Sequence, residues 1–490
     1  MLLLGDVWTC DPQRPRATAV YVENGLVADV GLAEDLRARY PKAKRYRFER
    51  ITPGVQDAHV HPVYWGQWLA SLDLRDENDP ARVAGRVAAA AAGKKPGEWI
   101  RGGGFVFDHY PDSRLLDAAA PHNPVYLDSR DLHSAWVNRL ALEKAGIDRQ
   151  TPDPEGGRIV RDGAGEPTGY LLEHAVSLVA DALPPPQKED LVRGLQDFAA
   201  RGYVAVHAMG DMPPQATEWA RELAVAGELP LRLAWTLPKK IWRSYGPEKI
   251  GEQLHIFGVK FFADGALTSR TAWMLHEYPT GGHGMPLDDP RQHDDEVAAV
   301  IEAGLQPVWH AIGSRAIREL LNLIDRLEAR GLPARSRFRI EHVQHVDPAD
   351  LPRLAGLRLS MQPLHARDDA QNIRILLGPA DKTSYRWRSL TELPGTVVAF
   401  GSDAPVAEPD LAAGISVAVA HPIDDGQSLK LHRALRGYTI SAAETLGWSN
   451  EHKPWGIISR RAKAVLSIWE NNEIIMRAFN GDLQSTRLSK

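Results

Sequence analysis

The sequence lacks the features that define several large classes of protein. Only one of its 490 residues is cysteine, Cys10, which excludes an intrachain disulfide and a cysteine-based zinc site. No stretch approaches the roughly 18 consecutive apolar residues of a membrane-spanning helix. The net charge is −5 and there is no long basic run. We therefore expect a protein that binds neither membranes nor nucleic acid.

The lack of a signal-like segment and of cysteines also bears on where in the cell the protein is expected. The opening Met-Leu-Leu-Leu-Gly-Asp is too short for the apolar region of a secretory signal, and no basic segment precedes it. A single cysteine is in keeping with a reducing compartment. We expect a cytoplasmic protein whose partner is a small-molecule substrate. The oligomeric state stays open, with a homodimer as one option.

Both ends of the chain predict β structure. In Ala19–Val30, apolar residues alternate on either side of Asn24-Gly25, a dipeptide that favours the type I′ turn of a hairpin. Near the other end, Ala464–Trp469 and Ile474–Phe479 are candidate strands. Because chain ends often lie close together, we expect residues 1–50 and 450–490 to form one small β-sandwich domain.

Between these ends, short apolar runs alternate with helical stretches. Eight runs pass into polar or Gly-rich loops: Ile51–His61, Tyr203–Gly210, Leu231–Pro238, Phe257–Gly265, Gln306–Gly313, Arg337–Gln344, Leu357–Pro363 and Val397–Pro405. Helical periodicity marks Asp294–Gly304 and Ser314–Gly331. Alternating β and α units predict a parallel sheet, and eight units suit a closed ring. The predicted fold is α/β, a distorted TIM (β/α)8 barrel over residues 51–449.

The gap between the first and second runs is too long for one crossover. We expect residues from about 66 to 186 to form an insertion after the first barrel strand, with an extended run at Pro124–Asp131. A helix at Lys188–Arg201 would lead back to the second strand. Insertions on the C-terminal side of a barrel often serve as lids or pocket walls.

Side chains that bind metals fall at the ends of these runs. His59 and His61 are two residues apart, so on a strand both point to one face and can share a cation. Four other runs each carry one further candidate ligand: Lys260, His310, His342 and Asp403. The C-terminal strand ends of such a barrel carry its catalytic groups. Imidazole nitrogen suits zinc, so we predict a Zn²⁺ centre there.

His310 and His342 could contact the substrate directly instead of binding metal, and the other four residues each have a structural alternative. His59 and His61 would then be ordinary buried histidines, and Asp403 would cap the helix that follows it. Lys260 would be a buried lysine paired with a carboxylate.

The order of these residues is similar to the pattern of the amidohydrolase superfamily. The segments Pro53–His61, Val259–Ala272 and Arg339–Gln344 resemble its YtcJ-like branch, amidohydrolase family 3, which includes N-substituted formamide deformylases. The resemblance covers most of residues 1–450. It fails at Ser459–Leu466, where the family's closing Pro-Gly and Asp are missing.

The resemblance implies how the metal would be held. His59 and His61 would bind one ion, and His310 and His342 would bind a second. Lys260, carboxylated by CO2, would bridge the two ions. If Lys260 is unmodified, a single metal ion is the natural alternative.

The resemblance also implies the chemistry. Asp403 would ligate metal, take a proton from the attacking water and pass it to the leaving amine, and His342 would share in catalysis. Bound zinc lowers the pKa of water from about 15.7 toward about 7, which supplies hydroxide at neutral pH. We expect hydrolysis of a non-peptide carbon–nitrogen bond, such as a small amide or formamide. Ester or lactone hydrolysis at the same site and a non-catalytic scaffold are the alternatives.

Five further residues are candidates for substrate contact. Arg270 lies in the loop after the fourth run, His365 follows the seventh, and His207 lies on the second. Asp131 and His133 lie in the insertion. For Arg270 the structural alternative is an ion pair that holds the loop, and Asp131 and His133 could instead lie just behind the residues that contact the substrate.

Overall fold

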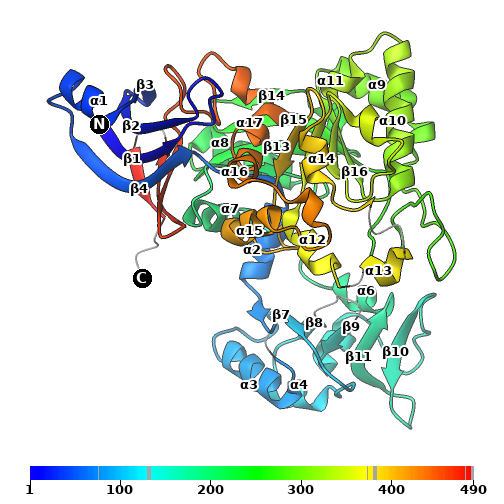
Figure 1. The fold of residues 1–490 in the computed structure, drawn as a ribbon. Coiled ribbons are helices and arrows are strands. Elements are labelled where there is room, and N and C mark those ends of the chain that lie inside the picture. Colours follow the sequence, from blue (N-terminus) through cyan, green and yellow to red (C-terminus); the bar gives the residue numbers. More distant parts are fainter. Residues whose placement is uncertain (76, 130–133, 372, 379–382, 480–481, 487–490) are drawn as a thin grey trace. The chain divides into compact units, whose positions relative to one another are not determined.

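The computed structural model describes residues 1–75, 77–129, 134–371, 373–378, 383–479 and 482–486 (Figure 1). The chain divides into two units, Met1–Val63 with Leu191–Lys490, and Tyr64–Asp190. Among the described residues, no helix combines the length and the apolar character needed to cross a bilayer.

The first unit contains a nearly closed barrel of eight parallel strands. They are β5 (Gln56–Val60), β12 (Ala205–Ala208), β13 (Arg232–Pro238), β15 (Leu254–Phe262), β16 (Gln306–Ala311), β17 (Arg339–His342), β18 (Arg358–Met361) and β19 (Val397–Phe400), adjacent in this order. A parallel bridge between Val60 and Ala404 brings the last strand beside the first. Seven of the apolar runs contain one of these strands, and the run Phe257–Gly265 overlaps β15, which begins earlier, at Leu254. The predicted barrel is therefore confirmed.

Amphipathic helices accompany the barrel strands. They include α7 (Lys188–Ala200), α8 (Ala216–Ala226), α9 (Asp294–Glu302), α10 (Ser314–Ala329), α11 (Ala334–Arg337), α12 (Pro363–Asp369), α13 (Ile373–Leu377), α14 (Trp387–Thr391), α15 (Leu411–Val419), α16 (Leu431–Gly437) and α17 (Ile440–Thr445). In α10 the buried residues Ile317, Leu320, Leu321 and Ile324 recur every three or four positions. That spacing gives the helix one apolar face. The short β14 (Glu248–Ile250) pairs antiparallel with β15.

The two chain ends share one sheet. Its strands are β1 (Leu2–Trp8), β2 (Arg16–Glu23), β3 (Leu26–Gly31), β4 (Arg45–Pro53), β20 (Leu466–Glu470), β21 (Glu473–Phe479) and β22 (Asp482–Ser485), and α1 (Ala33–Arg39) follows β3. The strand order is β22-β21-β20-β4-β1-β2-β3. Asn24 and Gly25 join β2 to β3 with φ angles of 51° and 71°, as a type I′ turn requires.

The C-terminal strands complete this sheet although the family's closing motif is missing. β20 lies antiparallel to β4, with Leu466 opposite Pro53. Val30 of β3 and Ala478 of β21, from opposite halves of the sheet, belong to one buried hydrophobic cluster. The sheet therefore surrounds a shared core, as the layers of a sandwich do.

The second unit has a sheet of its own. Its elements are α2 (Pro62–Leu69, which begins in the first unit), β6 (Leu72–Asp73), α3 (Pro80–Ala91), β7 (Ile100–Phe105), α4 (Arg114–Ala119), β8 (Val125–Ser129), β9 (Ser134–Val137), α5 (Arg139–Lys144), β10 (Gly157–Arg161), β11 (Pro167–Glu173) and α6 (Ala175–Ala180). The strands pair in the order β10-β11-β9-β8-β7-β6. Val83, Leu116 and Trp136 belong to its buried core. This unit lies between β5 and β12 in the chain, where the sequence predicted an insertion.

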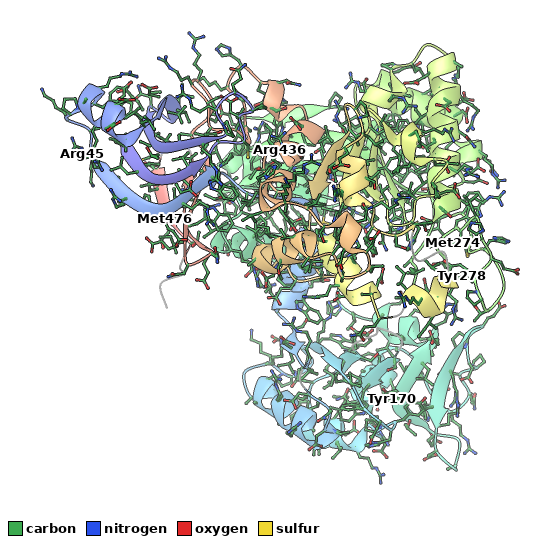
Figure 2. The ribbon with its side chains drawn as sticks, in the orientation of Figure 1. Arg45, Tyr170, Met274, Tyr278, Arg436 and Met476 are labelled. Atoms are coloured by element: carbon green, nitrogen blue, oxygen red, sulfur yellow. The ribbon has the colours of Figure 1, made fainter. Side chains whose placement is uncertain are left out.

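A buried arginine joins the terminal sheet to the barrel. Arg477 of β21 donates hydrogen bonds to the carbonyl oxygens of Tyr203 at 3.0 Å and Pro230 at 2.8 Å. Both acceptors lie in segments that lead into barrel strands. Burial lowers the pKa of Arg477 to about 10. Arg45 of β4, in contrast, is exposed on the same sheet (Figure 2).

We predict that Arg477→Met lowers the free energy of unfolding by about 2 kcal/mol, because two carbonyl groups lose a charged donor. A lower urea midpoint would measure this. Arg45→Met is the matched control and should leave the midpoint nearly unchanged. Equal midpoints for the two variants would contradict the role of Arg477.

Candidate metal centre

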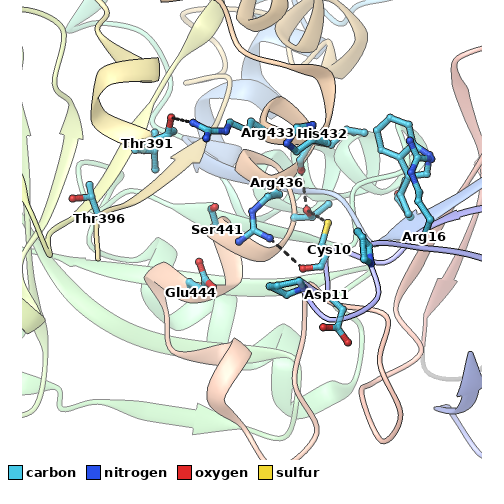
Figure 3. A pocket seen from close by; sticks show the side chains of 17 residues that line it. Cys10, Asp11, Arg16, Thr391, Thr396, His432, Arg433, Arg436, Ser441 and Glu444 are labelled. Carbon is cyan, nitrogen blue, oxygen red and sulfur yellow. Dashed lines mark hydrogen bonds between the residues drawn. The ribbon is translucent and has the colours of Figure 1, made fainter. Parts of the chain in front are cut away.

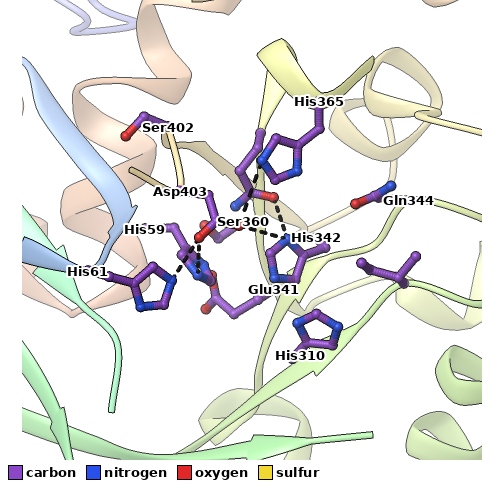
Figure 4. Close-up of polar contacts among 12 residues, drawn as sticks. His59, His61, His310, Glu341, His342, Gln344, Ser360, His365, Ser402 and Asp403 are labelled. Carbon is purple, nitrogen blue, oxygen red and sulfur yellow. Dashed lines mark hydrogen bonds and ion pairs between the residues drawn. The ribbon is translucent and has the colours of Figure 1, made fainter. Parts of the chain in front are cut away.

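The first and last barrel strands bring three predicted ligands together. Nε2 of His61 lies 2.8 Å from Oδ1 of Asp403, and Nε2 of His59 lies 3.3 Å from the same oxygen (Figure 4). The backbone N–H of Asp403 donates to the His59 carbonyl at 2.8 Å, which fixes the two segments side by side. Gly401 permits this approach, because a Cβ there would lie 2.5 Å from the backbone nitrogen of His59.

A second group of histidines lies near the same carboxylate, that of Asp403. His342 ends β17 and His365 lies on α12, and their rings approach Oδ2 of Asp403. Nδ1 of His342 is 3.9 Å from that oxygen and Nε2 of His365 is 3.7 Å from it. Nε2 of His365 is buried without a hydrogen-bond partner among the described residues. Asp403 therefore stands between two sets of imidazole nitrogens, and each set with Asp403 can hold a metal ion.

His310 and Lys260 extend the cluster. The ring centroid of His310 is 4.4 Å from that of His342, and its Nε2 lies 3.1 Å from the Gly265 carbonyl oxygen. Lys260 is buried on β15, and its charge adds to burial in lowering the pKa of His310 to about 3. Burial also lowers the pKa of Lys260 itself. The structure thus places all the predicted ligands at one end of the barrel.

Three histidines are oriented through Nδ1. The pairs are His59 with Glu341 at 2.7 Å, His61 with Asp211 at 2.7 Å, and His342 with Gln362 at 2.8 Å. When Nδ1–H donates to such a partner, Nε2 keeps the lone pair that a metal requires. This donor set suits a metal such as zinc.

These partners were missed in the sequence. Glu341 adjoins His342, and Asp211 directly follows the second run, but neither position shows which histidine it contacts. Burial alone would lower the pKa of His61, yet Asp211 and Asp403 raise it to about 10. Burial would likewise raise the pKa of Asp211, but His61 lowers it to about 2.

Beneath the cluster lies a buried ion pair. Nε of Arg339 donates to Oε1 of Glu341 at 2.6 Å, and both side chains have an exposed fraction of 0%. Burial alone would raise the pKa of Glu341, but Arg339 and His59 lower it strongly. Glu341 is therefore an ionised acceptor for Nδ1–H of His59.

The backbone is strained where these ligands leave their strands. His342, Val343 and Asp403 have φ angles of 73°, 48° and 64°. Residues other than glycine seldom adopt such values, and strain of this kind is often found at functional sites.

The loops after two neighbouring strands are held by Asp264. Its carboxylate accepts hydrogen bonds from the backbone N–H groups of Trp273 at 2.8 Å, Ile312 at 3.0 Å and Gly313 at 2.7 Å. Burial raises the pKa of Asp264 to about 7 in spite of these donors. Asp264 therefore joins the loop after β15 to the loop after β16, beside His310.

The candidates for substrate contact separate into distinct environments. His365 joins the cluster, and Arg270 is exposed in the loop after β15. His207 does not reach the barrel mouth: its exposed fraction is 0%, and its Nδ1 accepts a hydrogen bond from Arg339 at 2.9 Å. Its ring packs against Trp448, because the second strand turns this side chain into the barrel interior. Asp131 and His133 lie outside the described residues.

A parallel barrel with a histidine–carboxylate cluster at its C-terminal strand ends defines a class of metal-binding barrel proteins. Residues 49–478 match the amidohydrolase family, and residues 19–43 match the imidazolonepropionase-like composite domain of bacteria. The chain belongs to the amidohydrolase family and is a hydrolase.

Relatives along most of the chain agree with this assignment. Protein LONG AFTER FAR-RED 3 of Arabidopsis thaliana is 31% identical, over 90% of this chain and 82% of that protein. Putative amidohydrolase YtcJ of Bacillus subtilis is 30% identical, over 90% and 88%. N-substituted formamide deformylase of Arthrobacter pascens is 26% identical, over 97% and 94%.

Solved structures share the fold. An uncharacterized metal-dependent hydrolase from Pyrococcus furiosus superposes with a TM-score of 0.80, at 23% identity, over 96% of this chain and 99% of that one. Atrazine chlorohydrolase TrzN from Arthrobacter aurescens, complexed with zinc, superposes with a TM-score of 0.53 at 12% identity, over 100% and 96%.

We predict that Asp211→Asn weakens metal binding about 10- to 100-fold, because His61 loses the carboxylate that orients its ring. Titration of the metal-free protein against a chelator of known affinity would measure this. Asp295→Asn is the control, since that aspartate is 96% exposed and forms an ion pair with Arg330 on the surface. An affinity equal to that of the wild type would show that Asp211 does not position His61.

Proposed function

We propose that the protein hydrolyses a non-peptide carbon–nitrogen bond, an amide or formamide, in a small molecule. The observation that carries this proposal is the carboxylate of Asp403 between two sets of imidazole nitrogens. Hydrolysis of an unactivated amide needs a strong nucleophile and a group that protonates the leaving amine. The similarity to N-substituted formamide deformylase over 97% of the chain favours this substrate class.

The donor set favours zinc. His59 and His61 would hold one ion with Asp403, and His310 and His342 a second. When bound, zinc lowers the pKa of water and polarises the substrate carbonyl. The zinc in TrzN, which shares the fold, supports this choice.

Asp403 is suited to move the proton. Burial alone would raise its pKa, but His59 and His61 lower it well below the usual value, so the carboxylate is ionised at neutral pH. An ionised carboxylate beside the attacking water accepts its proton, and the resulting acid donates that proton to the departing nitrogen. His365, whose Nε2 lies 3.7 Å from the other oxygen of Asp403, would orient the carboxylate during this transfer.

Lys260 would enter the site as a carbamate. Its neutral amine is the form that combines with CO2, and burial favours that form by lowering the lysine pKa. The opposing influence of Glu341, Asp211 and Asp403 shows that a cationic lysine would also be accommodated. An unmodified Lys260 beside one metal ion is therefore the second arrangement to test.

A screen separates the proposed reaction from its alternative. Zinc-loaded protein would be offered N-formyl and N-acyl amines, together with esters and lactones of matching size, and chelator-treated protein would be the control. The proposal expects metal-dependent turnover of the amides. Turnover confined to esters or lactones would favour the alternative, and turnover that ignores removal of the metal would exclude the mechanism.

We predict that Asp403→Asn lowers kcat about 10²- to 10⁴-fold, because the variant has no carboxylate to carry the proton. Initial rates on the best amide of the screen would measure this, with metal content determined on the same samples. Asp295→Asn again serves as a surface control. Unchanged turnover at full metal content would remove Asp403 from its proposed role.

We further predict that Lys260 gains one CO2. Isotope-labelled bicarbonate should give a carbamate NMR signal in the zinc-loaded protein, and Lys260→Arg should abolish it. Lys463→Arg, at a lysine paired with Glu252 on the surface, is the control. If the wild type shows no carbamate signal, the proposed carboxylated Lys260 is wrong, and an unmodified Lys260 takes its place.

A further inference from the structure

A cavity of about 700 Å³ lies away from the metal ligands, at the opposite end of the barrel. Thr396 and Val398 line it where β19 begins, and Thr52 lines it just before β5. The metal ligands lie where these two barrel strands end. Cavities of roughly 300–1,000 Å³ are typical of small-molecule sites, so this one has the size of a binding pocket.

The wall carries two charged groups that are not paired with each other. Arg436 donates to the carbonyl oxygen of Cys10 at 3.1 Å and has no carboxylate within ion-pair distance among the described residues. Glu444 lines the same cavity, and its carboxylate forms no hydrogen bond or ion pair with any described side chain. Figure 3 shows the Arg436 side chain between Cys10, Ser441 and Glu444.

The other arginines of the wall already have partners. Arg433 donates to Thr391 and to Glu392, each at 3.4 Å, and Arg16 forms an ion pair with Asp6 at 2.8 Å. Arg436 is thus distinct among the lining arginines, because within the described part of the chain its guanidinium donates only to the Cys10 carbonyl oxygen.

A partly buried charged side chain loses contacts with water, and without an ion-pair partner nothing compensates for that loss. Burial raises the pKa of Glu444, and the positive charge of Arg436 opposes this shift from beyond ion-pair distance. A ligand with a carboxylate would satisfy Arg436, whose planar guanidinium matches that group. The same ligand would satisfy Glu444 if it also carried a cationic donor. Pro12, Val398 and Leu435 provide an apolar wall for the rest of the molecule.

We propose that this cavity binds a zwitterionic ligand of the amino-acid class with an apolar side chain. Its carboxylate pairs with Arg436 and its ammonium group with Glu444. The site is separate from the metal centre and does not depend on the reaction proposed above.

Calorimetric titration of the full-length, metal-loaded protein tests the proposal, with each common L-α-amino acid as a separate probe. We expect one or more of those with apolar side chains to bind. For the tightest of them, the acid without the amino group and the amine without the carboxylate should each bind at least about tenfold more weakly. An equally tight deaminated acid would mean a simple anion site and would overturn the proposal, as would no binding by any probe.

Variants locate the site. Arg436→Gln and Glu444→Gln should each raise the Kd at least about tenfold, whereas Arg433→Gln, at a lining arginine with partners, should leave it unchanged. Thermal unfolding would show that each variant is folded. If Arg436→Gln fails to fold, Glu444→Gln alone tests the site. Binding that survives Glu444→Gln, or that His61→Asn at the metal centre abolishes, would overturn the assignment.

Discussion

The architecture depends on the ion pair between Arg339 and Glu341 inside the barrel. Both side chains come from β17 and point to the same face, because they are two residues apart. Arg339 also donates to the carbonyl oxygen of Ala58 on β5 and to His207 on β12, so one guanidinium connects strands on different sides of the ring. Loss of either partner in such a buried pair leaves an uncompensated charge, which costs about 3–5 kcal/mol. The pair therefore stabilises the closed barrel and keeps Glu341 ionised beneath His59.

The candidate metal centre depends on this ion pair. Glu341 orients the His59 ring through its Nδ1. The backbone hydrogen bond from Asp403 to His59 holds the segment after the last strand beside the first strand. Positive φ angles at His342 and Asp403 each cost on the order of 1–3 kcal/mol, so the surrounding barrel must hold them in place. Rigid strand ends thus support a strained but defined arrangement of ligands. The fold alone does not specify the substrate.

The charges around the candidate metal centre determine which of its imidazole rings are protonated. Imidazole rings buried without compensation would stay neutral, as the lowered pKa of His310 shows. The carboxylates of Asp211 and Asp403 raise the pKa of His61 instead, because opposite charges lie within hydrogen-bond distance of its ring. Buried carboxylates and imidazoles in close contact form a site that attracts a cation. Asp403 is shared between the two groups of histidines.

Local patterns in the sequence determined the barrel strands, the hairpin at Asn24-Gly25 and the His59–His61 pair, because strand periodicity and turn preference act between near neighbours. The convergence of the candidate ligands was also predictable from the sequence, since a parallel barrel brings all C-terminal strand ends to one side. Only the tertiary structure showed that Asp211 and Glu341 orient the histidines and that His207 points inward to Arg339. Those contacts join strands far apart in the chain, and their geometry exists only once the ring of strands has closed.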